Sequence, residues 1–264
     1  MSRGPSFPYL ASSVDELTIE SVLHVHRILF QALRQAVRWQ LIPHNVAEAV
    51  ELPSPEPRAL VPLPPPEAGR LINLFEGTPL HTAVIFAIGS GLRLGEVFGL
   101  RWRDVDITSS RVSVVQTLHV DGSFDTSKTQ TSRATIFLPQ FALHALRSQR
   151  ADQNLRKLRL ALAWQDLDLV FDRGDGGPVD TRVVSRRFSA TARKGGFDLT
   201  FHSLRHAHAS LMHASGTDLK TISENMRHST IAITADLYTH VDSETHKSAA
   251  DRLDAYMSPF ITEG

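Results

Sequence analysis

The stretch "FHSLRHAHAS", residues 201–210, constrains the fold more than any other part of the chain. His202 and Arg205 are three positions apart, so on a helix they share one face. Such a pair is unremarkable by itself. Its meaning depends on three other stretches, each weak alone: "GLRLGE" at 91–96, "SKTQTSRATIFLP" at 127–139 and "MRHSTIAITADLYTH" at 226–240.

The histidines near residue 202 leave a metalloprotein open as one alternative. His202 and His206 stand at the i, i+4 spacing that can bind zinc on one helix. His213, with His208 nearby, could add imidazoles to the same helix. However, the segment contains no Glu or Asp, and "HSLRH" lacks the glutamate of the metalloprotease motif. No metal is therefore expected.

Composition limits the class of protein. The 264 residues suit one large domain or two small ones. The chain has no cysteine, which excludes disulfides and thiolate metal sites. No apolar run is long enough to cross a bilayer, and the first residues do not resemble a signal peptide. These features favour a cytoplasmic protein without membrane contact.

Net charge gives no support to nucleic-acid binding, because 28 basic and 28 acidic residues cancel. DNA binding would require the basic residues to be sorted onto one face. Two local clusters exist, "RSQRADQNLRKLR" and "TRVVSRRFSATARK". Each alone is more typical of a solvated helix face than of a DNA contact.

Periodicity predicts a mainly α protein with one small antiparallel β-sheet, an α+β class. A first helix is expected from about residue 18 to 41, because Val22, Leu29, Leu33, Ala36 and Val37 fall on one face. Further helices are expected at 67–77, 81–91, 92–102 and 139–160, and only helices from residue 181 onward. The first two of these end at glycines, as helix C-caps do. Residues 111–120, the Asp-Gly turn and residues 133–139 are expected to form strand, turn and strand.

The proline-rich stretch "PSPEPRALVPLPPP" predicts a linker, because proline cannot donate a regular hydrogen-bond ladder. We expect a helical unit at 1–57, a linker at 58–66 and a second domain at 67–264. Asn45 is the expected N-cap of a short helix in the first unit.

The last stretch contains Tyr238, one of only three tyrosines in the chain, ten residues after His228. A buried tyrosine that satisfies its hydroxyl with a neighbour is the ordinary interpretation of such a residue. The other stretches change that interpretation.

Together, in this order and spacing, the four stretches resemble the tyrosine recombinase, or phage integrase, family over roughly residues 18 to 250. The resemblance implies that fold for the catalytic domain, preceded by a partial helical core-binding domain that clamps DNA. It implies a catalytic set of Arg93, Lys128, His202, Arg205, His228 and the nucleophile Tyr238, with Glu96 in support.

The chemistry agrees with these residue types. Cleavage of a DNA phosphodiester builds negative charge on phosphorus, and arginine forks bind phosphate oxygens bidentately. Nearby cations favour the anion of a tyrosine, and a histidine can take its proton. Lys128 is a candidate acid for the leaving 5′-oxygen. The 3′-phosphotyrosyl product would keep the bond energy for rejoining, so no cofactor is expected.

Two departures from the family are present. Members usually carry Leu-Gly before the second histidine, where this chain has Met226-Arg227. A non-glycine residue in a left-handed conformation costs about 1 kcal/mol, but Arg227 could add a phosphate contact. Second, the core-binding unit is shorter than the family's four or five helices. The expected DNA-backbone contacts are Arg133, Arg186, Arg187 and Arg227.

The resemblance implies double-stranded DNA as partner, a homotetramer on two DNA sites, and accessory DNA-bending or directionality proteins. Its function would be site-specific recombination or integration, as for a mobile element. Two alternatives stay open beside the metalloprotein. One is a truncated, inactive integrase remnant that at most binds DNA. The other is a type IB topoisomerase-like activity, which shares the chemistry.

Overall fold

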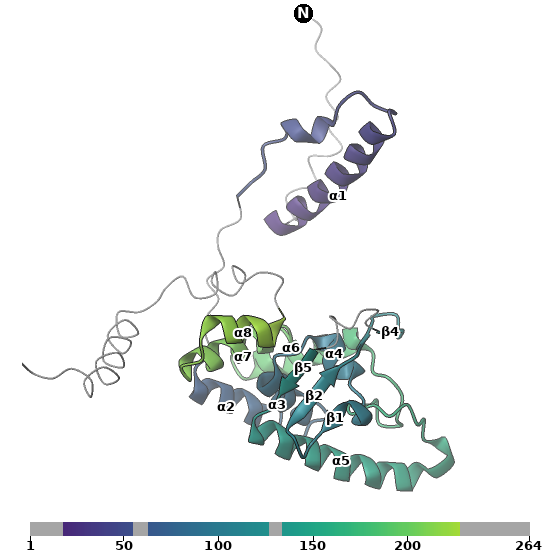
Figure 1. Cartoon of the computed structure of the whole chain (residues 1–264), viewed down its shortest axis with the longest axis vertical. Helices are drawn as coiled ribbons and strands as arrows, with labels where there is room; N and C mark the ends of the chain where they lie inside the picture. Colours follow the sequence, from purple (N-terminus) through teal and green to yellow (C-terminus); the bar gives the residue numbers. More distant parts are fainter. Residues whose placement is uncertain (1–17, 55–62, 127–133, 228–264) are drawn as a thin grey trace, which may run out of the picture. The chain divides into compact units, whose positions relative to one another are not determined.

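The computed structural model describes residues 18–54, 63–126 and 134–227 (Figure 1). The chain divides into two compact units, Met1–Ala59 and Leu60–Gly264. No helix in the described ranges is long and apolar enough to cross a membrane.

The first unit contains α1 (Ile19–Arg38) and the 3₁₀ helix η1 (Val46–Ala49). Thr18 caps α1, and the Asn45 side chain accepts from the Ala47 N–H at 3.1 Å, so the predicted N-cap is confirmed. The amide of Asn45 also donates to Phe30 O at 3.2 Å, which holds the loop against α1. The predicted apolar face of α1 is only half-buried, and Leu29 is 53% exposed.

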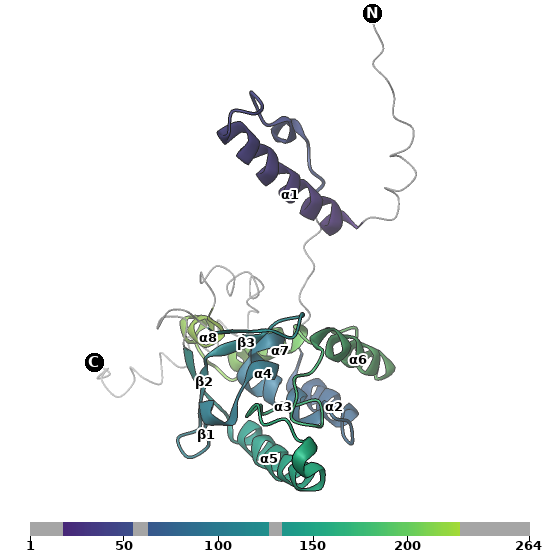
Figure 2. The ribbon, with the colours of Figure 1, turned by 90° about the vertical axis from the view of Figure 1, so that its right-hand side faces the viewer.

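The second unit is helical, with short strands on one side (Figures 1 and 2). Its order is α2 (Pro65–Leu74), α3 (His81–Ser90), α4 (Leu94–Gly99), η2 (Trp102–Asp104), β1 (Val105–Asp106), β2 (Arg111–Val114), β3 (Gln116–Leu118), β4 (Phe124–Thr126), β5 (Ala134–Phe137), α5 (Gln140–Leu160), η4 (Ala161–Ala163), α6 (Thr181–Lys194), α7 (Ser203–Ala214) and α8 (Leu219–Met226). The predicted α-rich class is confirmed.

The strands form two antiparallel sheets, where one was expected. One sheet has the order β1-β2-β5, with Val112 opposite Ile136, and the other pairs β3 with β4. The predicted strand 111–120 is therefore divided between the two sheets. Its Asp-Gly turn is confirmed, because the His119 N–H donates to Ser123 O across it. The prediction missed β4, whose three residues are too few to show a period.

Helix α3 is the centre of the hydrophobic core. Its sequence, HTAVIFAIGS, is apolar on every side, and it packs against both α5 and α7. A helix that is hydrophobic all round is expected to be buried in this way. Phe86 of α3 is fully buried and meets the Phe171 ring at 5.5 Å. The C-terminal end of α3 is therefore held firmly beside α7.

Helix α4 lies against β3, and Gly95 permits the close approach. A Cβ at Gly95 would come within 2.5 Å of Leu118 O and 2.7 Å of Thr117 Cγ2. This contact fixes α4 on the sheet, and α4 begins directly after Arg93.

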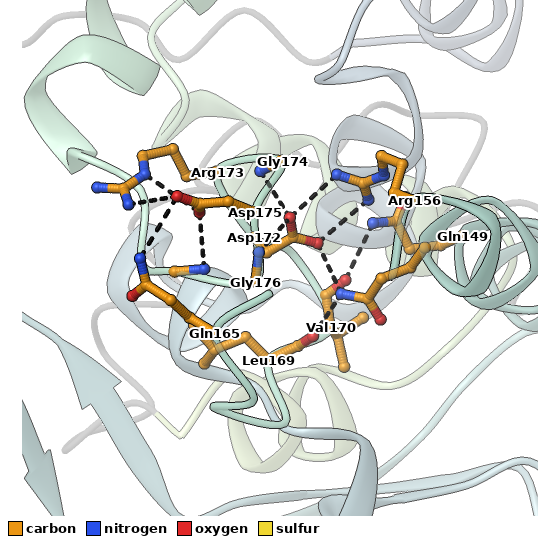
Figure 3. A network of polar contacts seen from close by, with 12 residues as sticks. Gln149, Arg156, Gln165, Leu169, Val170, Asp172, Arg173, Gly174, Asp175 and Gly176 are labelled. Carbon is orange, nitrogen blue, oxygen red and sulfur yellow. Dashed lines mark hydrogen bonds and ion pairs between the residues drawn. The ribbon is translucent and has the colours of Figure 1, made fainter. Parts of the chain in front are cut away.

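The glycine-rich turn after the extended segment 167–171 is tied to α5 by a buried carboxylate (Figure 3). Asp172 has a fully buried side chain that accepts from Arg156 Nη1 at 3.0 Å and from Gln153 Nε2 at 2.6 Å. The Gly174 N–H donates to the same carboxylate at 2.6 Å. Arg156, from the first basic cluster, therefore has a structural partner within the protein.

Candidate active site

The site is built where the C-terminal end of α3 meets the N-terminal end of α4, in the stretch "GLRLGE". Gly91 ends α3 in the left-handed region, with φ of 64°, and its N–H donates to Ala87 O at 2.9 Å. This is the glycine C-cap that the sequence predicts. The chain then turns sharply, and Arg93 becomes the N-cap of α4.

Glu96 holds Arg93 at this turn. Its carboxylate accepts from the Arg93 backbone N–H at 2.9 Å, as a residue at the third helical position does in a capping box. It also pairs with Arg93 Nη1 at 3.2 Å. The Glu96 side chain is 7% exposed, whereas that of Arg93 is 48% exposed. The arginine is therefore fixed at its base and accessible at its tip.

Arg205 joins three helices from a buried position on α7. It is 3% exposed, and its Nη1 donates to Gly91 O at 2.6 Å, although the two residues are 114 positions apart in the sequence. Its Nη2 donates to Met226 O at the end of α8. The guanidinium thus satisfies carbonyls left free at the ends of α3 and α8.

Burial, and then the charge of Arg93, lower the pKa of Arg205 to about 10. Arg205 therefore remains a cation at neutral pH. Two arginines are close enough to influence each other electrostatically, with the Glu96 carboxylate as counter-charge. Such a cluster is suited to bind an anion.

His208 supports the same turn from one helical turn beyond Arg205. Its Nδ1 lies 2.8 Å from Ile88 O, so the Nδ1 atom carries the proton and donates to that carbonyl. The ring lies directly beneath Gly91, where an added Cβ would come within 2.5 Å of His208 Cδ2. Gly91 is therefore required both for its backbone conformation and for this contact.

We expect Gly91→Ala to destabilise the protein by about 2 kcal/mol, because the variant combines positive φ with a steric clash. Thermal unfolding measures this effect. The matched control is Gly69→Ala on α2, where no atom lies within 4 Å of the added methyl. That control should be neutral or slightly stabilising. Equal melting temperatures for the two variants would contradict the packing described for Gly91.

Stability should depend on pH through His208. Burial first, and the charge of Arg205 with it, lower the pKa of His208 below its usual value near 6.5, although the bond to Ile88 O opposes this. Below pH 6.5, His208 is therefore protonated to a larger extent in the unfolded chain than in the folded chain. The free energy of unfolding should fall as pH drops from 6.5 through the lowered pKa, by at most about 1.4 kcal/mol per pH unit.

The control for this dependence is His208→Asn, whose side-chain amide can still donate to Ile88 O but does not titrate. Urea unfolding between pH 7.5 and 5.5 should show a smaller loss of stability in the variant. An identical pH dependence in both proteins would remove His208 from the explanation.

His202 lies at the N-terminal end of α7, as its N-cap. The imidazole is accessible and meets the His206 ring at 4.9 Å, edge to face. Partial desolvation, followed by the charges of Arg205 and Arg93, lowers the pKa of His202. The ring is therefore neutral at pH 7 and able to accept a proton.

Arg227 ends α8 in the left-handed conformation, with φ of 54° and ψ of 47°. This is the backbone geometry for which the usual glycine would be suited. Its Nη2 lies 2.5 Å from Glu96 Oε2. Burial alone would raise the pKa of Glu96, but the charge of Arg227 and the bonds from Arg93 and Arg227 outweigh it, so that pKa is lowered.

The structure thus brings together Arg93, Glu96, His202, Arg205 and Arg227 from among the predicted site residues. Arg186 and Arg187 lie exposed on α6, outside the contacts described above. The predicted residues Lys128, Arg133, His228 and Tyr238 lie outside the described residues.

The sequence interpretation missed the supporting role of His208. The sequence did contain an indication of this role, because His208 follows Arg205 by three positions and therefore lies on the same helix face. The described residues include no group of three or more His, Asp or Glu side chains placed to hold a metal ion.

Residues 63–245 match the phage integrase family. Among curated relatives, the chain is 28% identical over 244 residues to an integrase of Streptomyces ambofaciens, covering 87% of this chain and 62% of that protein. It is 32% identical over 221 residues to the tyrosine recombinase XerC of Xanthomonas axonopodis pv. citri, covering 80% of this chain and 65% of that one. The chain thus spans less than two thirds of the length of both relatives.

Solved structures share the fold. The Tn1549 transposon integrase in complex with transposon right-end DNA superimposes with a TM-score of 0.76 at 19% identity, covering 92% of this chain and 82% of that one. A lambda integrase tetramer bound to a Holliday junction gives a TM-score of 0.63 at 20% identity, covering 89% of this chain and 64% of that one.

Proposed function

The chain belongs to the phage integrase family, and on that premise we propose that it cleaves and rejoins duplex DNA at specific sites through a covalent 3′-phosphotyrosyl intermediate at Tyr238. The observation that carries the proposal is that Arg93 and Arg205, from distant parts of the sequence, meet at the turn after α3, with His202 beside them. Glu96 accepts from the Arg93 N–H, Arg205 donates to Gly91 O, and burial, together with the charges of both arginines, lowers the pKa of His202.

In the proposed reaction the Tyr238 oxygen attacks phosphorus and the bond to the 5′-oxygen breaks. Arg93 and Arg205 stabilise the negative charge that develops on the non-bridging oxygens. Preorganised charge of this kind is a large catalytic contribution. His202, neutral at pH 7, accepts the phenol proton, and Lys128 donates a proton to the leaving 5′-oxygen. His228 donates to a non-bridging oxygen.

Rejoining is the reverse reaction, in which a 5′-hydroxyl attacks the phosphotyrosine and Tyr238 leaves. The phosphotyrosyl bond retains the energy of the phosphodiester, so neither a nucleotide cofactor nor a metal is invoked. Exchange of partners between two cleaved duplexes would give recombination, which we assign to a homotetramer on two DNA sites. The lambda integrase tetramer on a Holliday junction supports this assembly by analogy of fold.

The test is covalent trapping on DNA. The protein is mixed with a pool of nicked duplexes of randomised sequence, in which cleavage next to the nick releases a short fragment and prevents rejoining. We expect adducts that survive denaturant, form equally well with a chelator present and enrich one sequence. Loss of the adduct in chelator would favour a metalloprotein, and absence of any adduct would favour an inactive remnant.

A strand-exchange assay distinguishes a recombinase from the remaining alternative, a type IB topoisomerase-like activity. With the enriched sequence placed on two duplexes, a recombinase should give exchanged products. Relaxation of a supercoiled plasmid without exchanged products would instead favour a topoisomerase-like activity.

Lys128 gives a chemical prediction within this proposal. A substrate with sulfur in place of the bridging 5′-oxygen has a leaving group that needs no proton. Lys128→Ala should cleave this substrate nearly as fast as the unmodified protein, while cleaving the ordinary substrate at least tenfold more slowly. Single-turnover rates on both substrates measure this, and equal defects on the two would rule out the acid role.

A further inference from the structure

Arg227 occupies a position that its backbone does not favour. Non-glycine residues rarely adopt positive φ, and among the described residues only Gln40, Ser110, Ala161, Asp168 and Arg227 do so. Such strain persists where the surrounding structure stabilises it, and it is concentrated at functional sites. The positive φ of Arg227 therefore points to a role for its side chain at the end of α8.

That side chain is directed into the protein. Nε and Nη2 of Arg227 are buried without a hydrogen bond to the described residues, and the side chain as a whole is 19% exposed. Nη2 forms an ion pair with Glu96 Oε2 at 2.5 Å. In this arrangement these two nitrogens are not accessible to a DNA phosphate. The geometry therefore favours a contact within the protein over the phosphate contact that the sequence suggested.

Glu96 consequently receives two arginines from different parts of the fold. One is Arg93, at the start of α4, and the other is Arg227, at the end of α8. Met226, the residue before Arg227, is held separately by Arg205. The end of α8 is thus fixed by two adjacent contacts, one through its backbone and one through a side chain, and both lead to the turn around Arg93.

We propose that Arg227 is a positioning residue, which acts through Glu96 to fix the end of α8 against the Arg93 turn. From there the sequence continues directly to His228 and, after ten more residues, to Tyr238. The inference rests on the proposed function above, because it assigns Arg227 a role in aligning the two ends of the same site. Arg227 is not a catalytic residue on this account, since it touches Glu96 and not the reacting phosphate.

The first test separates the rate of cleavage from DNA affinity, using the trapped duplex as substrate. Arg227→Gln should lower the single-turnover rate at saturating DNA at least tenfold, with affinity and its salt dependence unchanged. Arg227→Lys should recover part of the rate, because it keeps the charge. The matched control is Lys220→Gln, which removes an exposed charge from the same helix and should cleave normally.

Two results would overturn the proposal. One is a normal rate at saturating DNA in Arg227→Gln. The other is weaker binding with a salt slope reduced by about 0.9, as expected for loss of one phosphate contact. Arg227→Gly removes the side chain and also relieves the backbone strain. Because only the loss of the side chain can then lower the cleavage rate, this variant should show the same rate defect as Arg227→Gln.

The second test needs neither DNA nor activity, so it remains informative if the proposed function fails. Thermal unfolding is measured for Arg227→Gln, Glu96→Gln and the double variant. If the two side chains act on each other, the fall in Tm of the double variant should be smaller than the sum of the two single falls. Additive falls would overturn the link between Arg227 and Glu96, whereas absence of any DNA adduct with the unmodified protein would overturn the proposed function instead.

Discussion

Arg205→Lys is expected to slow DNA cleavage at saturating substrate at least tenfold, which corresponds to about 1.4 kcal/mol in the barrier. Lysine keeps the charge but has one nitrogen, so it cannot donate to Gly91 O and Met226 O in the geometry of the guanidinium. The variant therefore loses the bidentate donor geometry of the guanidinium and one of the connections between α3 and α8. Leaving a buried carbonyl unsatisfied should also cost about 1–3 kcal/mol of folding stability.

Arg93→Lys distinguishes the loss of cleavage rate from the loss of folding stability. The Arg93 side chain is about half exposed and, among the described residues, pairs with Glu96, so its replacement should leave stability nearly unchanged. A comparable loss of rate in both variants, with a loss of stability only in Arg205→Lys, would assign the rate effect to the phosphate clamp. The control is Arg103→Lys, an exposed residue paired with Asp168, which should match the unmodified protein. Weaker DNA binding with an intact rate at saturation would contradict the clamp role.

Tyr238→Phe is expected to abolish the covalent adduct while DNA affinity is preserved. The substitution removes one oxygen, the proposed nucleophile, and adds nothing that could replace it. The chain offers two matched controls, because its only other tyrosines are Tyr9 and Tyr256. Tyr9→Phe and Tyr256→Phe should form the adduct at the unmodified rate, and an adduct with Tyr238→Phe would disprove the assignment.

The amino-acid sequence predicted the helix caps and backbone conformations that depend on a few neighbouring residues. Gly91 was expected as a helix C-cap, and the structure gives it the left-handed conformation that such a cap requires. Position 227 was expected to be left-handed because the family usually carries glycine there, and Arg227 adopts that conformation despite its side chain. Asn45 as an N-cap is a third case. In each, a few neighbouring backbone groups determine the outcome.

Contacts between distant segments could not be predicted in this way. Nothing near Arg227 in the sequence indicates that its guanidinium pairs with Glu96, and nothing near Ile88 indicates that His208 binds its carbonyl. Strand β4 was missed for a related reason, because three residues become a strand only through their pairing with β3. The helical period predicted the apolar face of α1 but could not predict what covers it, and Leu29 is 53% exposed.

Peptide mapping of the trapped adduct shows whether Tyr238 becomes joined to a 3′-phosphate of DNA. The adduct is digested with nuclease and protease, and the modified peptide is sequenced by mass spectrometry. We expect a nucleotide attached through its 3′-phosphate to Tyr238 within "IAITADLYTH". Attachment to Tyr9, Tyr256 or any other side chain, or through a 5′-phosphate, would contradict it.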